Sequence, residues 1–271
     1  MPVEGPTLVR RQLGRRLRAL REAARKTAAD VEYVASRSKL WRIEEGKSPV
    51  RVADVKELAR IYGADDVTID ALAALALGTT GRGWWEDFGD VLPYDLRLYV
   101  DLEASADEVK TFHPDVVDGL LQTPDYARAV EIGSGLDVAE ATVDRVVAMR
   151  MQRQRVVLDG ERRGRVTAVL GAGALARQVG SRRIMAEQLR HLRRLSDRVE
   201  IRVLPWEAGA HPAMIGQFTI FEFASADDPS VLYLETYVGA RYVDTAPQVD
   251  HQRSIFARIH ERSTPLEEHA P

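Results

Sequence analysis

Apolar residues recur every three or four positions through much of the first eighty residues. Leu8 to Ala24 has this spacing, with arginines between the apolar positions. Val52 to Tyr62 and Thr68 to Leu77 repeat this spacing. Gly63 follows the first of these segments, and Gly78 follows the second. The pattern predicts three amphipathic helices, two of them ended by a glycine.

Two shorter helices, joined by a tight turn, are predicted between the first of these and the second. Thr27 is placed to cap the earlier one, and the carboxylate of Asp30 can support its first amides. Ser36 is placed to cap the later one, which Gly46 ends. The N-terminal part of the chain is therefore expected to be an all-α domain of five short helices.

The rest of the chain contains both the alternation of apolar and polar residues typical of strands and the three-to-four-residue spacing typical of helices. Short β-branched or alternating runs predict four strands, at Val166–Leu170, Val199–Leu204, Gln217–Phe223 and Val231–Glu235. Helical spacing returns at Ile184–Leu195 and Gln248–Arg262.

The fold class expected from these elements is α+β, with two domains. A helical domain over residues 1–80 is followed by a mixed α/β domain with a small sheet over 84–262. The glycine-rich stretch GTTGRG at 78–83 is the predicted linker, and 263–271 is a predicted tail.

The two predicted domains also differ in net charge. The 271 residues carry a net charge of −3. Residues 1–80 hold 15 Lys/Arg against 11 Asp/Glu, and the rest of the chain holds 23 against 30. A basic module joined to an acidic body suits contact with a polyanion at one end only, although arginine-rich helices can also simply present solvated faces.

Composition narrows the class further. The sequence is 45% hydrophobic and contains no cysteine, which excludes disulfides and thiolate chemistry. It contains no run of about 18 apolar residues and begins without the apolar core of a signal peptide. We expect a soluble, cytoplasmic protein with no membrane partner.

The helix predicted after Ser36 carries the candidate DNA-reading residues. A short helix that exposes cationic and hydrogen-bonding side chains suits the major groove. Arg37 is a candidate for a bidentate pair with guanine, and Lys47 and Arg51 are candidates for phosphate contacts. The DNA-binding set is expected to comprise Thr27, Arg37, Ser38, Lys39, Trp41, Arg42, Lys47 and Arg51.

Structural alternatives exist for three residues of this helix. Trp41 can pack against a neighbouring helix or a dimer partner. Arg42 can pair with Glu45 or Glu32. Glu44 is expected to pair with an arginine of the first helix, because its carboxylate would repel phosphate.

The N-terminal residues resemble a known family. RxLRxLREAAxKT, SRSKLWRIEEGK and VRVADVxxL are similar to the XRE-type helix-turn-helix of phage repressors and actinobacterial regulators. Ala28 stands where that family has glutamine, and the approach from Thr27 to Ser36 is about two residues short. This shortening predicts an unusual turn or a truncated first helix.

The C-terminal residues carry a second resemblance. DGLLQTPDYARA, RxxRQ, QLxxL, VLPxxxGxH and YxE resemble the C-terminal domain of WhiJ-like, antitoxin-like actinobacterial regulators, over roughly residues 84–259. This resemblance implies a DNA-binding protein that is often encoded beside a small partner protein.

Polar residues of the second domain have two interpretations. Thr123 and Pro124 predict a helix start, and the surrounding stretch can be a structural corner. It can also be a ligand or partner pocket. The residues expected to line such a pocket are Gln122, Tyr126, Arg128, Arg150, Arg153, Gln154 and His211.

Catalysis is not expected. The six histidines lack zinc-ligand spacing, and the sequence has no GxSxG motif. Gly171 and Gly173 follow a predicted strand but lack the remaining residues of a phosphate-binding loop. We expect no catalytic residues, no metal site and no cofactor.

The sequence thus predicts a sequence-specific transcriptional regulator that binds double-stranded DNA as a homodimer. Its second domain is expected to mediate dimerisation and to bind a partner or signal, such as a small protein encoded by an adjacent gene. Two alternatives remain. One is a one-component sensor of a small-molecule effector. The other is an interaction protein with a degenerate helix-turn-helix.

Overall fold

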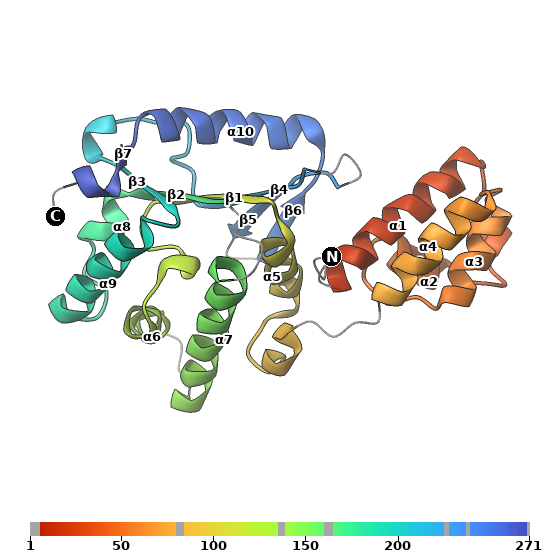
Figure 1. The fold of residues 1–271 in the computed structure, drawn as a ribbon, viewed down its shortest axis with the longest axis horizontal. Helices are drawn as coiled ribbons and strands as arrows, with labels where there is room; N and C mark the ends of the chain where they lie inside the picture. Colours follow the sequence, from red (N-terminus) through yellow and green to blue (C-terminus); the bar gives the residue numbers. More distant parts are fainter. Residues whose placement is uncertain are drawn as a thin grey trace. The chain divides into compact units, whose positions relative to one another are not determined.

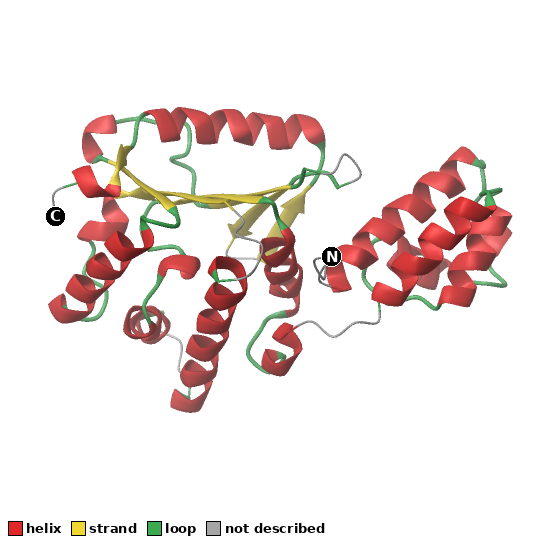
Figure 2. Cartoon of the chain, in the orientation of Figure 1, coloured by secondary structure: helices red, strands yellow, loops and turns green. Residues whose placement is uncertain are grey.

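A computed structural model describes residues 6–79, 84–134, 139–159, 165–224, 228–236 and 239–269 (Figures 1 and 2). Contacts divide the chain into two units, Met1–Asp87 with Val100–Ser105, and Phe88–Tyr99 with Ala106–Pro271. Of the predicted linker, Gly78 ends a helix and Thr79 caps it. Residues 80–83 lie outside the described ranges.

The first unit is helical. Within residues 6–79 it contains a 3₁₀ turn, Ala29–Val31, and four α-helices: α1 (Pro6–Ala23), α2 (Arg37–Glu44), α3 (Val52–Ile61) and α4 (Asp66–Gly78). Leu13, Leu17, Leu40, Ile43 and Leu58 are among the buried side chains of its core. The periodicity of the sequence therefore identified the faces that pack together.

One of the five predicted helices is shorter than expected. The helix predicted to begin after Thr27 is a single 3₁₀ turn, so the shortened approach reflects a truncated first helix. Thr27 does not cap it. Its backbone N–H and its hydroxyl instead both donate to the carboxylate of Asp30, at 2.7 and 2.8 Å.

The second unit is built on a seven-stranded sheet of order β6-β5-β4-β1-β2-β3-β7. Its strands are β1 (Glu108–His113), β2 (Arg165–Gly171), β3 (Glu200–Leu204), β4 (Phe218–Glu222), β5 (Val231–Thr236), β6 (Gly239–Val243) and β7 (Thr264–Pro265). Strands β1, β2 and β3 are parallel, and β1 pairs antiparallel with β4.

Helices cover both faces of this sheet. They are α5 (Tyr94–Ser105), α6 (Pro124–Gly133), α7 (Glu140–Leu158), α8 (Ala172–Ala176), α9 (Arg182–Leu195) and α10 (Ala246–Glu261). Figure 1 shows α10 on one face and α6, α7 and α9 on the other. The chain thus has the expected α+β class, with a helical N-terminal region followed by a mixed α/β region.

Three strands were not predicted. In β1 the charged residues Glu108 and Lys110 interrupt the apolar positions, which hides a strand at the centre of the sheet. The other two, β6 and β7, are short edge strands. The segment predicted as a tail supplies β7, which pairs with β3; residues 270 and 271 lie outside the described residues.

No helix in the described part of the chain is long and apolar enough to cross a membrane.

Candidate nucleic-acid interface

The helix α2 forms for local reasons that its sequence makes clear. The hydroxyl of Ser36 accepts a hydrogen bond from the Lys39 backbone N–H at 3.3 Å, which caps the first turn as predicted. Leu40 and Ile43 are buried and fix its inner face. The chain leaves the helix through Gly46, whose φ of +66° favours glycine.

Two contacts with α1 hold α2 in place. Arg21 donates two hydrogen bonds to the carboxylate of Glu44, at 2.6 and 2.9 Å, which confirms the structural role predicted for Glu44. Gly14 allows the second contact, because a Cβ at this position would lie 2.4 Å from the carbonyl oxygen of Ile43. The backbones of the two helices therefore approach closely.

The opposite face of α2 is open to solvent. Arg37, Ser38, Trp41 and Arg42 are all exposed there. In the described ranges the side chains of Arg37 and Arg42 form no hydrogen bond or ion pair. Arg42 does not pair with Glu45, which instead lies 3.5 Å from Arg18. Both guanidinium groups are therefore available to an external acceptor.

Lys39 and Trp41 have different contacts within the first unit. Lys39 binds Asp54 on α3 at 2.7 Å, so its charge is already neutralised within the unit. Trp41 is 52% exposed, and the ammonium of Lys47 lies over its ring at 4.1 Å. Within this unit Trp41 is thus not a core residue, whereas Lys39 joins α2 to α3.

Thr27 and Arg51 flank this face in the sequence. Arg51 is exposed immediately before α3. Thr27 is also exposed, but it donates its hydroxyl hydrogen to Asp30. Because phosphate only accepts hydrogen bonds, Arg51 is the better phosphate ligand of the two.

Sequence reasoning missed Gly14 and Asp54. A glycine inside a helix lowers its stability, so its presence there indicates a packing reason, such as the close approach of another backbone. Asp54, by contrast, looks like an ordinary exposed residue of α3, and nothing in its spacing identifies Lys39 as its partner.

The polar residues proposed to line a pocket in the second unit bond mainly to one another. Gln122 donates to the Val117 carbonyl at 2.7 Å and accepts from Arg150 at 2.8 Å. Gln154 donates to the carbonyls of Gly119 and Gln122 at 2.9 and 2.8 Å. These bonds join α7 to the turn before α6, as the structural-corner interpretation requires.

Three other residues of that predicted set also have partners within the protein. Tyr126 is fully buried, and its hydroxyl accepts from the Val117 N–H at 3.2 Å. The Arg153 guanidinium lies over the ring of Tyr99 at 5.1 Å. Arg128 pairs with Asp144 at the surface. Each of these three side chains therefore already has a partner within the protein.

His211 lies apart from them, in the loop after β3. Its ring contacts the Phe112 ring edge-on, with centroids 5.8 Å apart. Its Nδ1 is buried and has no hydrogen-bond partner among the described residues. Burial, followed by the charge of Arg262, lowers the pKa of this imidazole.

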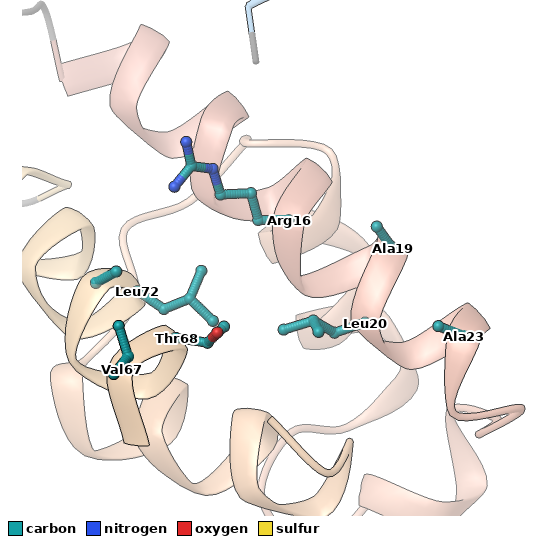
Figure 3. A pocket seen from close by; sticks show the side chains of 8 residues that line it. Arg16, Ala19, Leu20, Ala23, Val67, Thr68 and Leu72 are labelled. Carbon is teal, nitrogen blue, oxygen red and sulfur yellow. The ribbon is translucent and has the colours of Figure 1, made fainter. Parts of the chain in front are cut away.

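A groove of about 500 Å³ runs between α1 and α4. Figure 3 shows Leu20 of α1 pointing toward Thr68 and Leu72 of α4. No residue of α2 lines it, so it does not belong to the exposed face of that helix. The structure, within the residues it describes, contains no group of three His, Asp or Glu that could hold a metal ion.

Comparisons with known proteins identify both regions. A family described as a helix-turn-helix domain matches residues 12–72. A family described as a domain of unknown function (DUF5753) matches residues 96–269. No curated protein and no solved structure matches the chain.

Proposed function

The chain belongs to the DUF5753 family and carries a helix-turn-helix domain, and from these two findings we propose that it is a sequence-specific DNA-binding transcriptional regulator. The observation that carries the proposal is the exposed face of α2. It presents Arg37 and Arg42 without polar partners among the described residues, on a helix fixed to α1 by Arg21 and Gly14.

This face has the chemistry that base reading needs. A guanidinium donates in a fork that matches O6 and N7 of guanine, and each such pair contributes about 1–3 kcal/mol of discrimination. Ser38 can donate to a base edge, and the ring of Trp41 offers an apolar surface. Lys47 and Arg51 supply charge for the backbone.

The protein acts as a homodimer in this proposal. An eight-residue helix contacts only a few base pairs, and two half-sites double the number of contacts. The second unit then mediates assembly and binds a regulatory partner, such as a small protein encoded nearby. Its role is regulatory and not catalytic.

The sensor alternative gains no support from the described contacts. The polar groups of Gln122, Arg150 and Gln154 hydrogen-bond to neighbouring protein groups, so they do not form an open polar site. The interaction-protein alternative rests on the shortened approach to α2 and on Ala28, which stands where the XRE-type family has glutamine. Against it, α2 keeps its cap, its core residues and its attachment to α1.

Selection from a pool of random duplexes tests the proposal. The full chain should enrich one motif, and Arg37→Ala should weaken the preference at one of its positions by about 10-fold or more. Arg60→Ala is the matched control, since this exposed arginine lies on α3 and pairs with Glu57. Enrichment of no motif, or equal motifs for wild type and Arg37→Ala, would contradict base reading by α2.

A further inference from the structure

Helix α9 carries a concentrated positive charge within an acidic unit. Residues 182–198 hold six arginines against two acidic residues, although residues 81–271 as a whole have an acidic excess. The six are Arg182, Arg183, Arg190, Arg193, Arg194 and Arg198, and all are exposed.

Five of these arginines share one side of the helix. At ~100° per residue, Arg182, Arg183, Arg190, Arg193 and Arg194 lie within roughly 120° of its circumference and along about 18 Å of its length. We call these five residues the arginine face. The opposite side, with Met185, Gln188 and Leu192, is buried against the unit.

The arginine face is largely unneutralised. Arg183 has acidic neighbours, Glu187 at 3.2 Å and Asp125 at 3.7 Å. Among the described residues Arg182, Arg193 and Arg194 form no side-chain hydrogen bond or ion pair. The bond of Arg190 to the Ala186 carbonyl, at 3.3 Å, leaves its charge uncompensated.

Helix stability does not explain this arrangement. Cations near the end of α9 favour its dipole, but Arg182 and Arg183 lie in its first turn, where cations are unfavourable. Arg190 also has like charges three and four residues on, at Arg193 and Arg194, and such pairs destabilise helices. An external anion would offset both costs.

The helix is a rigid support for such a contact. Gln188 is fully buried, accepts from the Thr123 N–H at 2.7 Å and donates to the Leu121 carbonyl at 2.6 Å. These two bonds fix α9 to the segment before α6. Figure 1 shows α9 next to α6, at the end of the helical layer.

We propose that the arginine face is a second DNA contact, which binds the phosphate backbone next to the site read by α2. This inference rests on the proposed function. Once the first unit binds, the flanking duplex is at high effective concentration for the tethered second unit. The contact is independent of sequence, because it is made to phosphates alone.

A membrane or a protein partner fits the arginine face less well than DNA does. A membrane-bound amphipathic helix needs a free apolar face, and that of α9 is buried inside the protein. Protein interfaces have an apolar centre, whereas between these arginines the exposed face offers only Ala186. A uniform phosphate backbone matches a row of arginines without apolar neighbours.

The test compares two triple variants of the full chain, each of which loses three positive charges from the second unit. One is Arg190→Gln/Arg193→Gln/Arg194→Gln. The matched control is Arg155→Gln/Arg241→Gln/Arg258→Gln, which alters exposed arginines on other elements. Affinity is measured against salt for a long duplex with the selected site at its centre, and for a short duplex with the site alone.

On the long duplex, the α9 variant should lose about 0.9 from the salt slope for each phosphate contact removed, up to ~2.7. The control should retain its slope, and neither variant should change binding to the short duplex. Replacing the same three α9 residues by lysine should preserve the slope, since lysine also neutralises phosphate. Unfolding curves of the α9 variant establish that it is folded.

Equal slopes for the α9 variant and the control would overturn this inference and leave base reading by α2 intact. Loss of binding to anionic phosphatidylserine vesicles, with an unchanged DNA slope, would also overturn it and assign the face to membranes. Failure of the wild type to select any duplex would instead overturn the proposed function.

Discussion

Arg21 of α1 holds Glu44, the last residue of α2, through two hydrogen bonds of 2.6 and 2.9 Å. The two side chains are only 17% and 9% exposed. Hydrogen bonding to Glu44 raises the pKa of the guanidinium. Because this pair joins the two helices, it determines how the outer face of α2 is presented.

Arg21→Ala should lower the free energy of unfolding by about 2–3 kcal/mol, because it leaves a mostly buried carboxylate without its partner. Chemical denaturation measures this loss. Arg18→Ala is the control: its pairs with Glu22 and Glu45 are exposed, so the loss should be about 0.5 kcal/mol or less. Equal losses would mean that the Arg21 pair contributes no more than a surface pair.

Gly14→Ala should destabilise the first unit by about 2 kcal/mol or more, because the added Cβ would meet the carbonyl oxygens of Ile43 and Glu44 at 2.4 and 2.6 Å. Gly133→Ala makes the same substitution where a Cβ meets no atom of the described residues within 4 Å. It should be neutral or stabilise by up to about 1 kcal/mol. Thermal unfolding of both variants compares them, and a neutral Gly14→Ala would show that α1 and α2 can separate freely.

Arg42 and Lys39 of α2 should differ in their effect on DNA binding. Arg42→Ala should weaken binding by about 10-fold, the equivalent of one lost bidentate contact. Lys39→Ala should weaken it by less than about 2-fold, because Lys39 is already paired with Asp54. Fluorescence anisotropy with the selected duplex measures both. The reverse order would show that Lys39 leaves Asp54 when DNA binds.

Because of Glu222 on β4, the second unit should become less stable at acidic pH. Burial raises the pKa of Glu222, but hydrogen bonds from Arg253 and Ser230 and the charge of Lys110 outweigh it and lower the pKa from 4.5 to about 2. The pKa of Glu222 is lower in the folded protein than in the unfolded chain. The ionised carboxylate therefore stabilises the folded state fully above about pH 4.5. As the pH falls from 4.5 toward 2, this contribution of about 2–3 kcal/mol is lost.

Denaturation at a series of pH values tests this effect. The wild type should lose stability between pH 4.5 and 2, and Glu222→Gln should lose less over the same range. Glu207→Gln alters an exposed carboxylate and should follow the wild type. Identical pH profiles for all three proteins would contradict the stabilising role of Arg253.

Local patterns in the sequence were sufficient for much of the first unit. The cap at Ser36, the left-handed Gly46 and the buried Leu40 and Ile43 all follow from residue type and helical spacing. The short approach from Thr27 to Ser36 left two alternatives, an unusual turn or a truncated helix. The structure decides between them, because Asp30 takes both donors of Thr27 and stabilises a single turn.

Long-range pairing explains what the sequence left open in the second unit. Strand β1 looks polar in isolation, and its apolar positions are recognised only when β2 and β4 lie on either side of it. Likewise, Gln122 and Arg150 look like ligand-binding residues until their mutual hydrogen bond is seen. Partners far apart in sequence cannot be read from spacing.

The central position of β1 has a consequence for the synthesis of the protein. One edge of β1 is closed by β4, which lies more than a hundred residues later in the chain. A chain that contains β1 but stops before Phe218 would therefore leave this edge of β1 unpaired, beside the buried Val109 and Phe112. Such open edges recruit strands from other molecules, so truncated products should aggregate and not accumulate as free helix-turn-helix domains.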